Sequence, residues 1–107
     1  MHEFIQVSTT SDQKETLQEI AQNLVDLKLA ACVQIGGPIE SVYRWQGKVE
    51  TATEWTCSIK SVRTLFPLIQ KLVQVKHNYD EPQIIVVPII DGSKAYLDWL
   101  NENCKHS

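Results

Sequence analysis

One histidine in this chain is placed where it could bind a metal ion. His77 lies in a polar segment, and the carboxylates Asp80 and Glu81 follow it three and four residues later. An imidazole together with carboxylates is a donor set that divalent cations such as Cu(II) or Zn(II) accept. The opposing interpretation is a solvated or capping cluster in a surface loop. The sequence therefore gives His77 as the candidate metal ligand and leaves the structural interpretation open.

Two further carboxylates, Glu50 and Glu54, share one face of a predicted strand, because side chains alternate along a strand. Such a pair could act as general acid and general base. Ion pairs with Lys48, Arg44 or a neighbouring subunit are the simpler explanation. We therefore assign no catalytic residue to this strand.

The three cysteines, Cys32, Cys57 and Cys104, offer no clear nucleophile. Their odd number and the absence of C-x-x-C spacing are typical of reduced thiols. Cys32 and Cys57 lie on predicted strands, where we expect buried and inert thiols, whereas Cys104 is expected to be more exposed.

The nucleotide-binding and hydrolase signatures that a short sequence can reveal are missing. The chain has no P-loop, no dinucleotide-binding glycine motif, no nucleophile elbow and no H-E-x-x-H. An acylphosphatase-like site would need a phosphate-binding loop after the first strand, and residues 8–12 contain neither glycine nor arginine. We predict that the protein is not an enzyme.

Composition places the chain among ordinary folded domains. Its 107 residues are 43% hydrophobic and 21% charged, without low-complexity stretches, so residues 1–107 are expected to form a single domain. A net charge of −3 indicates no broad basic surface, and we expect neither nucleic acid nor membrane as a partner. The sequence shows no secretory leader pattern and no membrane-spanning apolar run, so a cytoplasmic location is expected.

The elements that would position these residues begin with a strand at residues 4–9. A helix capped by Asp12 follows, and a second helix is expected from Thr64, with Pro67 in its first turn. The predicted buried faces of the two helices are Leu17, Ile20, Ala21 and Leu24, and Leu65, Leu68, Ile69, Leu72 and Val73.

The C-terminal part predicts one more strand and one more helix. Residues 84–90 are almost continuously apolar, which predicts a strand covered on both faces, while Pro88 places it at a sheet edge. Ser93 is expected to cap the last helix. The order β-α-β-β-α-β with a C-terminal helix predicts a ferredoxin-like α+β sandwich.

The longest predicted feature is a β-hairpin from about Leu29 to Lys60, bent at residues 36–38 and turning at Gln46-Gly47. Each arm of about 13 residues spans about 40 Å, whereas a compact domain of this length is about 35 Å across. The tip should therefore project beyond the domain. It would expose strand edges and apolar side chains unless other copies cover them, so we predict a homo-oligomer. The expected interface residues are Val42, Tyr43, Trp45 and Val49.

Four segments in order resemble the signature segments of the CutA divalent-cation tolerance family. They are Leu29-Ala30-Ala31-Cys32-Val33, Ser41-x-Tyr43-x-Trp45-x-Gly47-Lys48-x-Glu50, His77-x-Tyr79-x-x-Pro82 and Tyr96-x-x-Trp99-Leu100. The resemblance spans almost the whole chain. It implies a ferredoxin-like subunit, similar to the PII signalling proteins, that forms a homotrimer through its hairpins and takes part in the response to divalent cations, copper among them.

The resemblance transfers a metal site only in part. Copper binding in bacterial relatives is ascribed to a cysteine near the end of the first strand and to two adjacent histidines before the Tyr-x-x-Pro segment. Ser8 and Lys76 occupy two of these places here, and Asn78 replaces a common proline. The resemblance then implies Cu(II) or another divalent cation as a weakly bound ligand, with His77 as the remaining donor.

A second function, from a different class, also follows from the likeness to PII proteins. Clefts between subunits, lined by Tyr43, Glu54 and Tyr79, would bind an unidentified small molecule and alter a partner. Polar side chains that converge in a cleft would favour this function. His77 facing carboxylates or another imidazole would favour metal binding.

Overall fold

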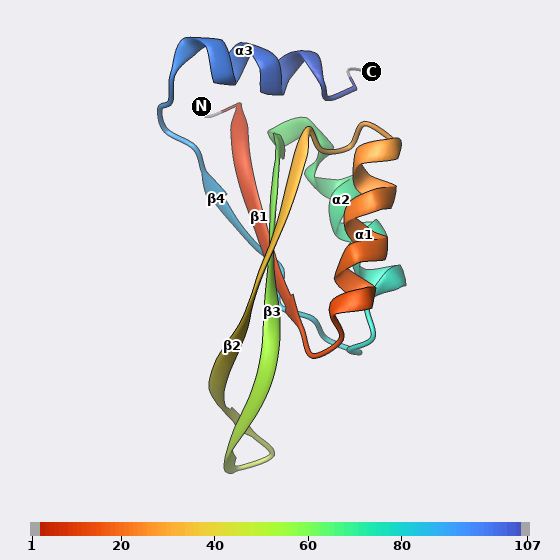
Figure 1. Cartoon of the computed structure of the whole chain (residues 1–107), viewed down its shortest axis with the longest axis vertical. Coiled ribbons are helices and arrows are strands. Elements are labelled where there is room, and N and C mark those ends of the chain that lie inside the picture. The colour runs from red at the N-terminus through yellow and green to blue at the C-terminus, as the bar shows by residue number, and fades with distance from the viewer. Residues whose placement is uncertain (1–2, 106–107) are drawn as a thin grey trace.

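The computed structural model describes residues 3–105 and consists of one sheet with two helices against one of its faces (Figure 1). The strands are β1 (Phe4–Ser11), β2 (Cys32–Trp45), β3 (Lys48–Val62) and β4 (Ile85–Pro88). The helices are α1 (Lys14–Asp26), α2 (Phe66–Lys76), which follows a short 3₁₀ turn at Arg63–Leu65, and α3 (Lys94–Glu102). The predicted order of elements is confirmed.

The four strands lie in the order β2-β3-β1-β4, and each neighbouring pair is antiparallel. This is the predicted ferredoxin-like arrangement. Pro88 of β4 pairs with Ile5 of β1. Because β4 is an edge strand, the N–H that Pro88 lacks is not needed for hydrogen bonds to a further strand. Among residues 3–105, no helix is long and apolar enough to cross a bilayer.

The hydrophobic core lies between the sheet and the helices α1 and α2. Alternate residues of β1 and β3 point into it, as the period of a strand requires. The fully buried members of the core are Ile5, Val7, Leu17, Ile20, Leu24, Cys57, Ile59, Ile69, Val73 and Leu100. These residues confirm the predicted inner faces, except that Leu68 on α2 is 46% exposed.

The β2–β3 hairpin extends past the rest of the sheet (Figure 1). β1 ends at Ser11, which pairs with Trp55, so residues 48–54 of β3 have β2 as their only strand neighbour within the described chain. The molecule is 44 Å long but only 25 and 22 Å across. The predicted projection of the hairpin is confirmed.

The turn and the bend of the hairpin follow from local residue chemistry. Gln46 and Gly47 both have positive φ, 50° and 78°, the conformation of a primed two-residue turn. The β2–β3 register shifts between Gly36 and Ile39, which confirms the predicted bulge. Gly37 has φ 128°, and an added Cβ would lie 3.1 Å from Cδ1 of Trp55, so only glycine fits there.

Two of the predicted helix caps are wrong. β1 continues to Ser11, and α1 has Gln13 rather than Asp12 at its N-cap position. The hydroxyl of Ser11 accepts a hydrogen bond from the Gln13 N–H at 3.0 Å. Ser11 therefore satisfies a backbone N–H at the start of α1, a role that was expected of Asp12. Thr64 lies inside the 3₁₀ turn, so that Leu65 occupies the N-cap position of α2.

Two other residues predicted at helix starts agree in position. Pro67 lies in the first turn of α2, as predicted. Ser93 occupies the N-cap position of α3, although its side chain donates no capping hydrogen bond and accepts none.

The expectation that residues 84–90 are covered on both faces is wrong for this chain. β4 is only Ile85–Pro88, and Ile85 and Val87 are 50% and 45% exposed. The half-buried Val86 between them faces the core. The reason is that α1 and α2 cover one face of the sheet and leave the other open.

The expected exposure of Cys104 is also wrong. Its side chain is 3% exposed, with Sγ 3.7 Å from the hydroxyl of Ser61, because α3 folds back over the end of the sheet. Burial raises the pKa of the Cys104 thiol, and burial raises the pKa of Cys57 to about 12. Both thiols are therefore protonated and inert near neutral pH. Cys32 is half-buried, and all three cysteines are free.

Candidate functional site

The loop after α2 packs against the end of β1 and brings the predicted histidine with it. His77 is the C-cap residue of α2, and its N–H donates to the carbonyl of Val73 at 2.9 Å. The side chain of His77 is only 9% exposed. The end of α2 places His77 there, because the backbone changes from helical to extended at this residue.

Both ring nitrogens of His77 already have backbone partners. Nδ1 accepts the N–H of Tyr79 at 3.0 Å, and Nε2 lies 2.8 Å from the carbonyl oxygen of Thr10. A carbonyl oxygen can only accept, so Nε2 carries the proton and Nδ1 offers its lone pair to Tyr79. A metal ion would have to displace one of these hydrogen bonds.

The carboxylates predicted to accompany His77 do not gather around it. Asp80 and Glu81 are both exposed to solvent. Within residues 3–105, no group of three or more histidine, cysteine, aspartate or glutamate side chains is arranged to hold a metal ion. One chain alone thus does not fit a metal centre, and metal coordination by His77 stays a prediction. His2 and His106 lie outside the described residues.

A different group of side chains does converge beside this loop. The hydroxyl of Tyr79 donates to Oε2 of Glu54 at 2.7 Å and accepts the N–H of Asp12 at 2.9 Å. It thereby joins the loop after α2 to β3 and to the β1–α1 connection. Glu54 is 8% exposed, although it lies on the projecting part of β3. Partial burial, followed by the contact with Glu54, raises the pKa of Tyr79, which keeps its hydroxyl a neutral donor.

Two residues that sequence reasoning did not select complete the cluster. The hydroxyl of Ser11 donates to Oδ1 of Asn78 at 2.6 Å, and Nδ2 of Asn78 donates to Oδ1 of Asp12 at 2.8 Å. Asn78 was considered only as a departure from a common proline. A signal was present nonetheless, because Ser11 and Asp12 directly follow a strand, where short polar side chains often bond to nearby loops.

The structure brings two of the three predicted cleft residues together and not the third. Glu54 and Tyr79 are in direct contact. Tyr43 pairs with Glu50, four residues from Glu54 toward the turn, which corresponds to about 13 Å along a strand. Glu50 is exposed, and in residues 3–105 neither carboxylate forms the ion pairs with Arg44 or Lys48 that the sequence suggested.

The predicted interface residues are all exposed in the single chain. Val42, Tyr43, Trp45 and Val49 have exposed fractions of 63%, 45%, 59% and 64%. An apolar surface of this kind on a projecting ribbon is typical of a subunit contact. Whether these residues form one stays a prediction, because the structure contains one chain.

Removing the Tyr79 hydroxyl tests the cluster. Tyr79→Phe leaves the buried carboxylate of Glu54 and the N–H of Asp12 without their partner, so we expect a loss of about 1–3 kcal/mol in the free energy of unfolding. Urea unfolding followed by circular dichroism measures it. Tyr96→Phe is the matched control, since no hydrogen bond of the Tyr96 hydroxyl occurs within residues 3–105. Equal stability of both variants would show that the Tyr79 contacts contribute nothing.

Comparison with known proteins adds a family match. Residues 5–103 match the family model described as CutA1 divalent ion tolerance protein. The divalent-cation tolerance protein CutA of Thermus thermophilus is 39% identical over 103 residues, which are 96% of this chain and 98% of that protein. The solved structure of the Thermus protein superposes with a TM-score of 0.92 over 95% of this chain and 99% of that chain, at 38% identity.

Two further relatives are described with a cellular location. The chloroplastic CutA of Arabidopsis thaliana is 39% identical over 95% of this chain and 56% of its own length. A structure described as the periplasmic divalent cation tolerance protein CutA of Archaeoglobus fulgidus is 40% identical, with a TM-score of 0.87 over 96% of this chain and 98% of that chain.

Proposed function

Because this chain belongs to the CutA1 divalent ion tolerance protein family, we propose that it acts in divalent-cation tolerance as a non-enzymatic homotrimer built through the β2–β3 hairpin. The family is not known for enzymes, in agreement with the absence of catalytic motifs. The observation that supports the trimer is the hairpin, which projects beyond its own sheet and exposes Val42, Trp45 and Val49.

The exposed surfaces of the chain fit a ring of copies. One open surface is the tip of the hairpin, and a second is the sheet face opposite α1 and α2, where Ile85 and Val87 are exposed. A hairpin that points away from its own domain can cover the second surface only on a neighbour. Contacts between two different surfaces repeat head to tail and close into a ring, and the likeness to PII proteins supports a ring of three.

We further propose that the trimer binds Cu(II) or another divalent cation only weakly, with His77 as the donor. Nδ1 of His77 would have to release the N–H of Tyr79 before it could coordinate a metal. The loss of this hydrogen bond makes the net free energy of metal binding less favourable. Asp80 and Glu81 are exposed and would have to move toward the ring, or carboxylates of another subunit would complete the site.

Calorimetric titration of chelator-stripped protein with Cu(II) tests this proposal. We expect saturable binding with a dissociation constant no tighter than micromolar, and at least a tenfold loss for His77→Ala. Asp91→Ala is the control and should bind Cu(II) like wild type, because it removes an exposed acidic side chain outside the segment of His77, Asp80 and Glu81. Equally strong Cu(II) binding by wild type and His77→Ala would show that His77 is not a metal ligand. No binding at all would leave the tolerance role without direct metal contact.

A second candidate function rests on the contact between Glu54 and Tyr79. A buried carboxylate paired with a tyrosine at the base of the hairpin is a polar anchor for a small molecule in a cleft between subunits. In an assembled ring, Tyr43 of a neighbouring hairpin would supply the third side of such a cleft. The failure of Cu(II) binding, together with a small molecule whose affinity depends on Glu54, would favour this function.

The proposed location is the cytoplasm. Three free cysteines support it, because reduced thiols persist in reducing compartments.

A further inference from the structure

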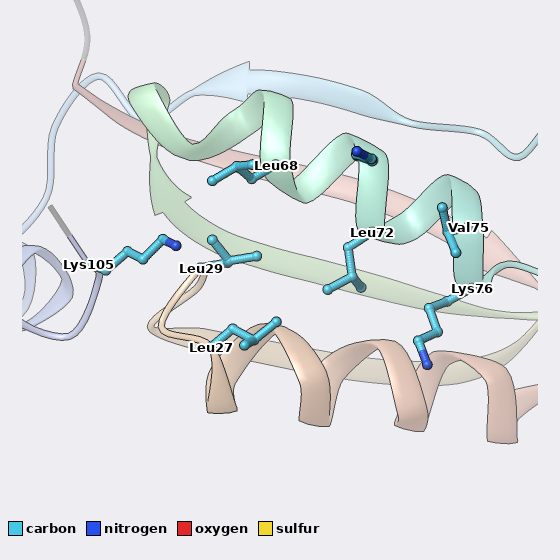
Figure 2. Close-up of a pocket in the computed structure, with 8 residues that line it drawn as sticks. Leu27, Leu29, Leu68, Leu72, Val75, Lys76 and Lys105 are labelled. Atoms are coloured by element: carbon cyan, nitrogen blue, oxygen red, sulfur yellow. The ribbon is translucent and has the colours of Figure 1, made fainter. Parts of the chain in front are cut away.

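A groove lies between α2 and the C-terminal end of α1 (Figure 2). Its volume is about 370 Å³. Five of its eight lining residues are leucine or valine and the other three are lysine, so no acidic side chain lines it. The apolar members are Leu27, Leu29, Leu68, Leu72 and Val75.

The apolar floor of the groove is a second stripe on α2. Leu68, Leu72 and Val75 are spaced by four and three residues and therefore share one side of the helix. Ile69 and Val73, on the neighbouring side, fill the core. Leu68 is 46% exposed and Val75 is 72% exposed, whereas Leu72 between them packs partly against the core, so the two ends of the stripe stay open to solvent.

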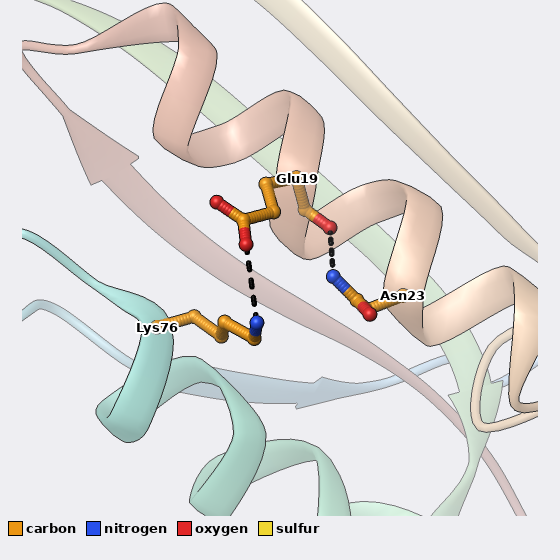
Figure 3. A network of polar contacts seen from close by, with 3 residues as sticks. All are labelled: Glu19, Asn23 and Lys76. Carbon is orange, nitrogen blue, oxygen red and sulfur yellow. Dashed lines mark hydrogen bonds and ion pairs between the residues drawn. The ribbon is translucent and has the colours of Figure 1, made fainter.

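An ion pair involves one of the lining lysines at one end of the groove. Nζ of Lys76 lies 3.1 Å from Oε1 of Glu19, and the side chain of Asn23 donates to the carbonyl of Glu19 at 2.7 Å (Figure 3). The Lys76–Glu19 pair links α2 to α1 and neutralises one of the three lysines. Figure 2 shows Lys105 at the opposite end, near Leu27, Leu29 and Leu68.

The remaining two lysines keep their charge free. Within residues 3–105, neither Lys71 nor Lys105 forms an ion pair or a side-chain hydrogen bond. Lys105 is nevertheless held in place, because its backbone N–H donates to the carbonyl of Lys28 at 2.8 Å. The chain carries a net charge of −3, so the groove has the opposite sign to the molecule as a whole.

We propose that this groove binds an anionic amphiphile with a single hydrocarbon chain, of the fatty-acid carboxylate class. The tail would lie on Leu27, Leu68 and Leu72, and the carboxylate would meet the ammonium group of Lys105, while Lys71 would add positive charge along the groove. A lysine is a suitable partner because its stem covers apolar surface while its charged end stays in water.

The size of the groove favours a small ligand over a protein partner. Its volume lies near the lower end of the range of about 300–1,000 Å³ for small-molecule sites. A stable protein interface buries about 800 Å² on each partner, which exceeds what the 11-residue α2 and one end of α1 present. The site shares no residue with the proposed trimer contact or metal site, so it stands independently of both.

Titration with dodecanoate, below its micelle concentration, tests the proposal on the full chain. Calorimetry gives the affinity, and backbone amide shifts of labelled protein give the location. We expect saturable binding of one molecule per chain, with shifts confined to α2, the end of α1 and Lys105. Decanoate, two methylenes shorter, should bind up to about fifteenfold more weakly, and the cationic dodecyltrimethylammonium at least about tenfold more weakly.

Three variants assign the effect to the groove. Leu68→Gln, at a half-exposed position, should weaken dodecanoate binding about tenfold without unfolding the chain. Lys71→Glu combined with Lys105→Glu should weaken it by a similar factor. Lys14→Glu, at the other end of α1 from Leu27, is a charge-reversal control outside the groove and should leave dodecanoate binding unchanged.

The contrary outcomes are equally definite. Equal affinity for the anionic and cationic amphiphiles, or unchanged binding to Leu68→Gln, would mean adsorption elsewhere on the surface and would overturn the proposal. The absence of saturable binding would do the same. A smaller particle mass for Leu68→Gln in light scattering would show that the groove is instead a contact between copies of the chain.

Discussion

Trp45→Glu is expected to convert the proposed trimer into single chains in dilute solution. Trp45 is 59% exposed in the single chain and pairs with Lys48 next to the turn, so the substitution removes little packing from the subunit itself. In the assembly, each of the three contacts would bury an unpaired carboxylate, at a cost of several kcal/mol apiece. Because the cost recurs at every contact, the effect on association is large.

Light scattering and sedimentation measure the result directly. Wild type should have about three times the 12.2 kDa mass of the chain, whereas Trp45→Glu should approach the mass of one chain. Trp45→Phe keeps an aromatic ring at the same place and should remain assembled. If Trp45→Glu keeps the wild-type mass through dilution to nanomolar concentration, the tip of the hairpin is not the subunit contact.

Ile59→Ala is expected to lower the free energy of unfolding by about 2–5 kcal/mol. Ile59 has no exposed surface and lies on β3, where it pairs with Val7 on one side and Val33 on the other. Truncating its side chain leaves a cavity between the sheet and the helices at the centre of the core. Neighbouring strands are hydrogen-bonded on both sides, so the site has little freedom to collapse around the smaller side chain.

Urea unfolding at one fixed protein concentration measures this loss, since the stability of an assembled protein depends on concentration. Ile90→Ala is the matched control, because it makes the same chemical change at a side chain that is 76% exposed. We expect that control to change stability by less than about 1 kcal/mol. A similar loss in both variants would contradict the assignment of Ile59 to the core.

The features that sequence predicts well here are those with local causes. The turn at Gln46-Gly47 and the bulge at Gly37 both need positive φ, which few residues supply without strain. The order of strands and helices follows from periodicity, and the edge position of β4 follows from Pro88. Each of these features is visible within a few residues of sequence.

Features that depend on distant contacts were missed. Cys104 was placed near a free end, yet α3 carries it into a pocket beside Ser61. The apolar run around Ile85 and Val87 was interpreted as a doubly covered strand, because an apolar run looks the same whether it faces a core or another chain. Sequence periodicity reports which residues avoid water and not which surface covers them.

In the candidate site, too, the residues could be predicted from the sequence but their distant contacts could not. His77, Glu54 and Tyr79 were all selected from the sequence, but the Glu54–Tyr79 contact joins residues 25 positions apart. The partners that occupy both nitrogens of His77 are backbone groups of Thr10 and Tyr79. Backbone groups carry no residue-specific signal, so their part in the site appears only in three dimensions.

The part of the hairpin beyond Ser11 has no neighbour within the described chain except its own second arm. A two-stranded ribbon alone is marginally stable in water. Its order would therefore depend on meeting other copies, and a newly made chain at low abundance would offer proteases an unprotected ribbon. In the proposed trimer, the lifetime of the protein in a cell would then be a collective property, because scarce copies would be degraded while abundant copies would protect one another.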